Sequence, residues 1–201
     1  MAKNWRLLVG TIEKRFSELA TLLPVFHSHA HKSIEESAIV IRNSFKNGNK
    51  ILICGNGGSA ADSQHFAAEF VNVFSRDIDR RGLPAMALST DTSIITAIAN
   101  DNSFENIFSR QVEAYANPGD VLIVMTTSGT SINCINALVT ARTRKVTSIA
   151  FTRENAEIAK LADICIEVPS VNTQHIQECH MLAYHVITEL VENSLFRGSE
   201  L

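Results

Sequence analysis

The chain has 201 residues, enough for one domain with a sizeable hydrophobic core. Its formal net charge of −3 gives no electrostatic basis for direct binding to nucleic acid. No apolar run approaches the ~20 residues of a membrane-spanning helix, and the N-terminus lacks the apolar segment of a signal peptide. These features predict a soluble cytoplasmic protein that is not embedded in a membrane.

Two helices are predicted before the first strand. The first covers residues 3–22, where apolar residues recur at helical spacing, and Pro24 interrupts the pattern. The second covers His31–Phe45 and ends at the turn sequence Asn47-Gly48-Asn49. We expect residues 1–46 to form an N-terminal helical extension that packs between the subunits of an oligomer.

From residue 51 onward, short apolar runs alternate with helical patterns. Strands are predicted at Ile51–Cys54, Ala85–Ser89, Val121–Met125, Val146–Phe151 and Ile164–Val168. Helices are predicted after the glycine-rich loop that follows the first strand and at Thr92–Ala99, Phe104–Tyr115, Ser131–Arg142, Ala156–Leu161 and Thr173–Leu195. This alternation predicts an α/β fold, a single domain over residues 1–201 with a five-stranded parallel sheet covered on both faces. Ligands bind such sheets at the carboxyl ends of the strands.

The loop after the first strand contains Gly55, Gly57 and Gly58, which permit a sharp turn from strand to helix. Ser59 stands where the N-cap of the following helix is expected. Such a turn directs backbone N–H groups and the positive end of a helix dipole at one point, which suits an anion. The loop lacks the G-x-G-x-x-G spacing of dinucleotide-binding proteins and the lysine of a P-loop. By itself it is equally compatible with a tight turn that binds nothing.

A second special loop follows the strand at Val121–Met125. It carries hydroxyl groups at Thr126, Thr127, Ser128, Thr130 and Ser131. Hydroxyls beside exposed backbone N–H groups suit the oxygens of a phosphate monoester without a basic side chain. N-capping of the next helix by Thr130 or Ser131 would need only one hydroxyl. The pattern therefore favours phosphate binding.

Titratable residues gather on two of the predicted helices. His65 and Glu69 are four residues apart on the helix that leaves the glycine-rich loop, so they share one face. The C-terminal helix carries a second concentration, which comprises His175, Gln177, Glu178, His180, His185 and Glu189. A metal or catalytic role is consistent with this set. The spacing does not choose between His180 and His185 as the functional histidine.

Several motifs together resemble the bacterial phosphoheptose isomerases of the sugar-isomerase (SIS) domain family. They are GNGGSAADSQHFAAE, the TTSGTS loop, Asn100-Asp101, FSRQVEA and IQECHMLAYHVITELVE, in that order between Lys46 and Phe196. The resemblance implies a three-layer sandwich with a five-stranded parallel sheet, and N-terminal helices used in a homotetramer. It implies an aldose–ketose isomerase that converts sedoheptulose 7-phosphate to D-glycero-D-manno-heptose 7-phosphate through an enediol. This would be the first step toward the heptose of lipopolysaccharide or other surface glycans.

The resemblance also implies a set of site residues. Zinc ligands are expected at His65, Glu69, Gln177 and His185. Substrate contacts are expected at Asn56, Gly57, Gly58, Glu69, Asn100, Asp101, Thr126, Thr127, Ser128, Ser131 and Gln177, and Ser59 is added as a further contact. Glu69 is expected to be the catalytic base and His185 its acid partner. Gln177 and His185 are separated by a rise of about 12 Å on a regular helix, so we expect an irregular start to that helix or ligands from two subunits.

The chain departs from the family pattern at Val73, where many relatives carry a basic residue. Arg76, Arg80 and Arg81 are candidates to replace that residue. An alternative function comes from a second resemblance, to the SIS protein that associates with the initiator of chromosome replication, a tetrameric scaffold without enzymatic activity. A sugar-phosphate sensor is a third alternative. The presence of all four ligand residues favours the enzyme.

Overall fold

The computed structural model describes residues 2–198, with side chains from residue 10 onward. Its centre is a five-stranded parallel sheet with the strand order β2-β1-β3-β4-β5. The strands are β1 (Ile51–Gly55), β2 (Ala85–Ala87), β3 (Val121–Met125), β4 (Thr147–Arg153) and β5 (Ile164–Val168). The predicted α/β fold with a five-stranded parallel sheet is therefore confirmed. β2 is shorter than predicted because the chain turns toward the next helix once Leu88 N–H has bonded to Ile53 O.

Six α-helices lie within the described residues. They are α1 (Ala2–Lys46), α2 (Gly58–Val71), α3 (Thr92–Asp101), α4 (Ser109–Tyr115), α5 (Ile132–Thr143) and α6 (Thr173–Phe196). Two predicted α-helices are wrong in part, because their residues form tighter i→i−3 turns. Phe104–Asn106 is a 3₁₀ helix that precedes α4, and Glu157–Lys160 is a 3₁₀ helix in place of an α-helix. No helix of the described part combines the length and apolar composition of a membrane span.

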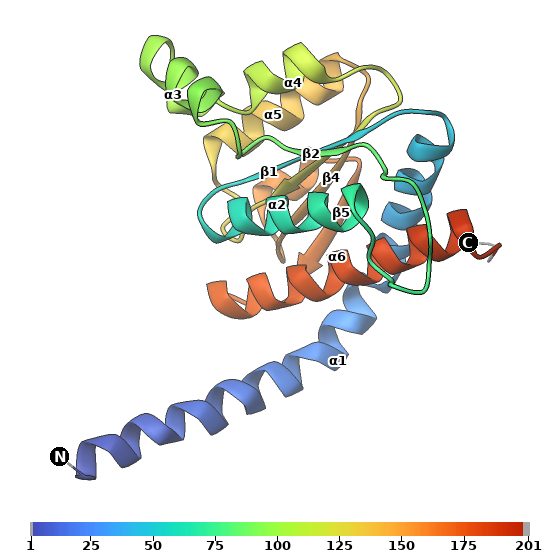
Figure 1. The fold of residues 1–201 in the computed structure, drawn as a ribbon. Coiled ribbons are helices and arrows are strands. Elements are labelled where there is room, and N and C mark those ends of the chain that lie inside the picture. The colour runs from blue at the N-terminus through green and yellow to red at the C-terminus, as the bar shows by residue number, and fades with distance from the viewer. Residues whose placement is uncertain (1, 199–201) are drawn as a thin grey trace.

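The two predicted N-terminal helices are one helix, α1, which continues through Pro24. Proline removes one helical hydrogen bond, so the sequence pattern favours a break. Packing overrides that preference, since Leu19 before the proline and Phe26 and Ala30 after it contribute to the same hydrophobic core. The C-terminal part of α1 packs against the body, whereas its N-terminal part projects away from it (Figure 1).

The sheet is covered on both faces by helices (Figure 1). Ile51 and Ile53 belong to the core shared with α1, α2 and α6, whereas Leu52 and Cys54 belong to the core shared with α4 and α5. α3 buries no side chain completely. The chain passes from β1 to β2 on one side and then returns to β3 on the other side of β1. The direction in which the chain adds strands therefore reverses between β1 and β3. Both special loops follow strands at this position, where open parallel sheets bind their ligands.

Candidate active site

The glycine-rich loop and the hydroxyl-rich loop lie side by side, because β1 and β3 pair directly and Gly55 is opposite Met125. A Cβ atom at Gly55 would lie 2.7 Å from Met125 O, so only glycine fits this close approach. The predicted N-cap at Ser59 is wrong. Gly57, with a φ of 56°, is the N-cap, and Ser59 lies buried in the first turn of α2. The left-handed turn at Gly57 lets the helix begin earlier than the serine suggested.

A small polar pocket of about 110 Å³ lies where the two loops meet. It is lined by Asn56, Ser59, Met125, Thr126, Thr127, Ser128, Ser131 and Gln177. Ser131 occupies the N-cap position of α5, but its side chain makes no capping hydrogen bond. Its hydroxyl instead lies 3.3 Å from the hydroxyl of Thr126. The hydroxyls are thus not used to cap the helix, and the lining has no charged side chain.

Asn133, which the sequence analysis missed, fixes one wall of this pocket. Its side chain and that of Asn56 exchange two amide hydrogen bonds, each 2.9 Å long. Asn133 is almost completely buried in the first turn of α5. A polar residue among the apolar positions of a helix is the only sequence signal for this contact. The pair holds Asn56 at the end of β1 in a defined orientation.

A cluster of three titratable side chains joins α2 to α6. One ligand atom each of His65, Glu69 and His185 lies within 4.8 Å of the other two. His65 Nε2 and Glu69 Oε1 are 2.9 Å apart, and the rings of His65 and His185 have centroids 5.1 Å apart. Burial lowers the pKa of His185 below its ordinary value, with an additional effect of His65, while Glu69 opposes the shift. Two imidazoles and a carboxylate are suitable donors for a divalent metal ion such as zinc.

Tyr184 is a second residue that the sequence analysis missed. Its phenolic oxygen lies 2.9 Å from Nδ1 of His65, the ring nitrogen opposite the one that faces Glu69. The Tyr184 ring is stacked on Phe66 at 4.9 Å and is completely buried. Burial raises the pKa of Tyr184, and the carboxylates of Asp62 and Glu69 add to the shift. The phenol is therefore protonated at neutral pH and orients the His65 ring.

The structure brings together three of the four predicted metal ligands and places Gln177 in the polar pocket. A Cβ atom at Gly58 would lie 2.5 Å from Gln177 Nε2, so this amide rests against the first turn of α2. α6 begins regularly at Thr173, capped by the side chain of Asn172. The expected irregular start of that helix is therefore wrong. Ligands from two subunits remain a prediction.

The structure distinguishes the two histidines that the spacing left open. His185 faces His65 and Glu69. His180 is completely buried instead, with Nε2 3.5 Å from the carbonyl oxygen of Thr152 and no partner for Nδ1. Burial lowers the pKa of His180 to about 4, so it is neutral at physiological pH. His185 is thus the histidine in a position for chemistry.

Asn100 and Asp101 are exposed at the C-terminal end of α3, apart from both the pocket lining and the cluster. The amide of Asn100 donates to Asp101 Oδ1 at 2.7 Å.

Arg80 cannot take the place of the basic residue that many relatives carry at the position of Val73, because its side chain is 0% exposed and pairs with Glu192. Arg76 and Arg81 are exposed.

The comparisons with known proteins agree with this architecture. The SIS domain family matches residues 16–153. A phosphoheptose isomerase of Aquifex aeolicus (strain VF5) is 50% identical over 193 residues, which cover 96% of this chain and all of that protein. The structure of a phosphoheptose isomerase from Neisseria gonorrhoeae aligns with a TM-score of 0.87 and 37% identity, over 92% of this chain and 99% of that one. A phosphoheptose isomerase from Francisella tularensis aligns with a TM-score of 0.88 and 33% identity, over 92% and 98%.

The chain belongs to the SIS domain family, since the family match covers more than half of it. The relative from Aquifex aeolicus at 50% identity and the two solved structures place it, within that family, among the phosphoheptose isomerases. The resemblance noted in the sequence is confirmed. The replication-initiator scaffold finds no support, because the relatives that match over nearly the whole chain are named as isomerases.

Proposed function

We propose that this protein is an aldose–ketose isomerase that converts sedoheptulose 7-phosphate to D-glycero-D-manno-heptose 7-phosphate. The observation that supports this most directly is that α2 and α6 both contribute to two unlike sites. One is a pocket of hydroxyls and backbone N–H groups, and the other is the His65–Glu69–His185 cluster. A substrate with a phosphate at one end and a carbonyl at the other needs both.

The phosphate is held by the hydroxyl pocket, without a charged partner. Thr126, Ser128 and Ser131 supply hydroxyl donors, and the N-termini of α2 and α5 add backbone N–H groups and helix-dipole charge. Ser59 and Gln177 line the same pocket and contribute further polar contacts. Asn100 and Asp101 lie on α3, which buries no side chain completely. Their contact with the substrate remains a prediction.

The isomerisation moves a proton from C1 to C2 of the sugar through an enediol. Glu69 takes a proton from C1 and returns one to C2. His185, the acid partner, donates a proton to the C2 carbonyl oxygen and takes one from the C1 hydroxyl, so that the carbonyl moves to C1. His65 lies against the Glu69 carboxylate, and Tyr184 orients His65. A positioned acid and base of this kind contribute factors of roughly 10² to 10⁴ each to the rate.

His65, Glu69 and His185 would hold one zinc ion per subunit, with Gln177 as the fourth predicted ligand. When bound, zinc acts as a Lewis acid that polarises the substrate carbonyl. The donor set supports this proposal, because zinc sites in enzymes combine imidazole and carboxylate ligands and keep one position open. Tight binding of Glu69 to the metal would lower its basicity, so the two roles compete.

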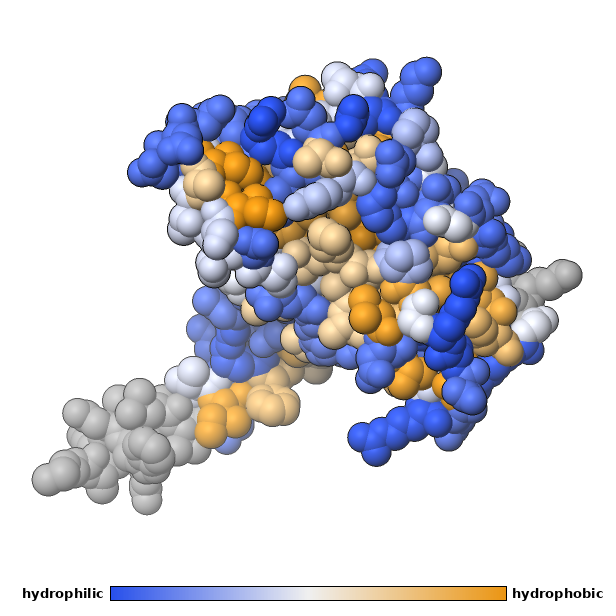
Figure 2. Space-filling view, turned by 45° about the horizontal axis from the view of Figure 1, so that its top comes forward, coloured by the Kyte–Doolittle hydropathy of each residue, from blue (hydrophilic) through white to orange (hydrophobic). Residues whose placement is uncertain are grey.

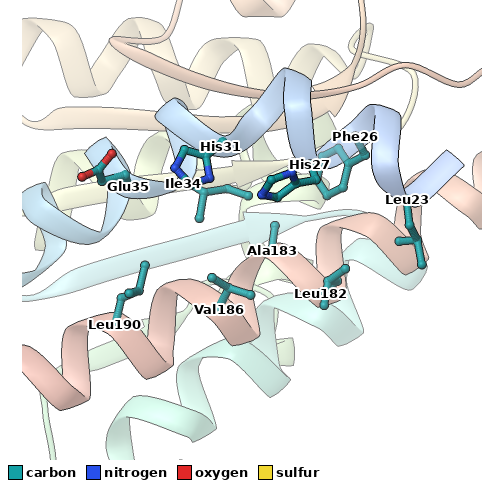
Figure 3. Close-up of a pocket in the computed structure, with 10 residues that line it drawn as sticks. All are labelled: Leu23, Phe26, His27, His31, Ile34, Glu35, Leu182, Ala183, Val186 and Leu190. Atoms are coloured by element: carbon teal, nitrogen blue, oxygen red, sulfur yellow. The ribbon is translucent and has the colours of Figure 1, made fainter.

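We infer that the protein assembles as a homotetramer through α1 and α6. A groove of about 440 Å³ lies between these packed helices, and Leu23, Phe26 and Ile34 of α1 face Leu182, Val186 and Leu190 of α6 (Figure 3). Further apolar side chains are exposed where α1 leaves the body, with Ile12 57% and Phe16 76% exposed (Figure 2). A second copy of the chain would cover both surfaces. Residues 1–46 would then be the oligomerising extension of a single SIS domain.

Turnover of sedoheptulose 7-phosphate by the purified protein tests the proposal, before chelation, after it, and after zinc is returned. Activity that chelation abolishes and zinc restores supports the isomerase together with its metal. Activity that is indifferent to chelation supports the isomerase and refutes a catalytic zinc. Absence of turnover with zinc present refutes the isomerase. The cytoplasmic location and the role in surface-glycan synthesis remain predictions.

A further inference from the structure

A buried ion pair connects the segment that follows α2 with α6, the two helices that carry the proposed catalytic cluster. Arg80, in the segment between α2 and β2, approaches Glu192 of α6 with an Nε–Oε1 distance of 2.6 Å. The two side chains are 0% and 1% exposed. Transfer of two charges from water to a protein interior costs about as much free energy as their attraction returns. Net stability alone therefore does not account for this pair.

Arg80 binds the last turn of α2, which carries Glu69. Its guanidinium donates to the carbonyl oxygen of Glu69 at 2.9 Å and to that of Phe70 at 2.8 Å. Carbonyl groups in the last turn of a helix have no partner within the helix. The guanidinium supplies two such partners at once, in a fixed planar arrangement. The backbone that bears the proposed base is thus fastened to Arg80.

Glu192 fastens the next segment of chain. Its carboxylate accepts from Phe74 N–H at 3.1 Å and from Ser75 N–H at 2.8 Å. The ring of Phe74 lies against His185, with ring centroids 5.7 Å apart. His185 and Glu192 are seven residues apart on α6, so they occupy one face of the helix. Glu192 thereby holds the backbone of the residue whose ring packs on the proposed acid partner.

We propose that Arg80 and Glu192 are positioning residues for this active site, which hold Glu69 through the backbone of α2 and His185 through Phe74. The inference rests on the catalytic roles proposed above for Glu69 and His185. Both members act through other residues, Arg80 on the helix end and Glu192 on the following loop. Without either residue, the distance between the base and its acid partner is less strictly fixed.

The chain contains a matched control whose hydrogen-bond partners lie outside α2 and α6. Asp120 precedes β3, its side chain is 2% exposed, and it pairs with Lys50 Nζ at 2.6 Å. It also accepts two backbone N–H groups, from Lys50 at 3.0 Å and from Asn117 at 2.8 Å. Asp120 and Glu192 thus each bind one basic side chain and two backbone N–H groups. Asp120→Asn and Glu192→Gln remove the same charge, but only Glu192 has partners that contact the residues of the cluster.

The test compares kcat, KM and zinc affinity of the two variants, at a temperature where circular dichroism shows both folded. For Glu192→Gln we expect kcat to fall about 10- to 100-fold at unchanged KM, the size typical of a displacement near 1 Å. We also expect weaker zinc binding in competition with a chromogenic chelator. Asp120→Asn should retain the wild-type kcat and zinc affinity. Equal kcat and equal zinc affinity in the two variants would overturn the proposal.

If Glu192→Gln does not fold, the kcat of Arg80→Lys tests the positioning role instead. Lysine keeps the charge beside Glu192, but one ammonium group cannot reproduce the planar fork at two carbonyls. A fall in kcat supports positioning, and an unchanged kcat refutes it. If wild-type protein lacks turnover, the proposed function fails instead. Crystal structures of the variants then test the positioning role. If Phe74 and the turn of α2 that carries Glu69 keep their wild-type positions, that role is refuted.

Discussion

The hydroxyl pocket and the catalytic cluster are neighbours that are built by opposite means. Most of the pocket lining lies at or just after the ends of two paired strands, Gln177 is added from α6, and the lining is uncharged. The cluster consists of titratable side chains from α2 and α6, which are far apart in sequence and meet only through packing. The difference implies that binding and proton transfer can be impaired separately.

The largest effect is expected at the cluster. Glu69→Gln keeps the shape of the side chain but removes the base, so we expect kcat to fall by roughly 10² to 10⁴ with little change in KM. Glu189→Gln, on the exposed side of α6, is the matched control and should have wild-type activity. Steady-state kinetics with sedoheptulose 7-phosphate measure both. A Glu69→Gln variant with normal kcat would remove the distinction between the two regions.

His180 is completely buried and belongs to neither region, so its protonation affects stability rather than binding or proton transfer. Its pKa of about 4 in the folded state lies below the ordinary 6.5, so between these pH values the unfolded chain binds the additional proton. The stability contributed by neutral His180 is complete above pH 6.5 and is lost as the pH falls toward 4. The shift corresponds to roughly 3 kcal/mol.

Chemical denaturation between pH 7.5 and 4.5 measures this contribution. The free energy of unfolding should fall more steeply with decreasing pH in the wild type than in His180→Gln, because glutamine at position 180 does not titrate. Parallel curves for the two proteins would contradict a buried neutral histidine at this position.

At the pocket, we expect an effect on binding. Ser131→Ala removes a hydroxyl that caps no helix. Because a hydrogen bond to a charged group contributes about 1.5–3 kcal/mol, KM should rise about 10- to 100-fold while kcat stays near the wild-type value. Thr143→Ala, at the exposed far end of the same helix, is the control. A fall in kcat without a change in KM would show that the pocket takes part in the chemical step.

The smallest effect is expected at Tyr184. Tyr184→Phe keeps the stacking on Phe66 and removes only the oxygen beside His65 Nδ1. Loss of such a partner of a ligand histidine should weaken zinc binding on the order of tenfold. Chelator competition measures the affinity, and Tyr115→Phe, on the partly exposed tyrosine at the end of α4, is the control. Equal zinc affinities would indicate that packing alone orients His65.

The parts of the protein that local pattern specifies were predictable. Val121–Met125 and Ile164–Val168 are strands with the predicted bounds, because a continuous apolar run between turn residues has one favourable state in a buried sheet. The glycine-rich and hydroxyl-rich loops were found for the same reason. Each is encoded by consecutive residues, and parallel pairing brings the strand ends together.

The sequence by itself determined the α/β class, the two loops and the helical spacing of His65 and Glu69. Tertiary structure decided that α1 continues through Pro24, that His185 rather than His180 joins the cluster, and that Asn133, Tyr184 and the Arg80–Glu192 pair support the site. The physical reason is range. Backbone preference and periodicity act over a few residues, whereas burial and side-chain partners depend on which distant elements pack together.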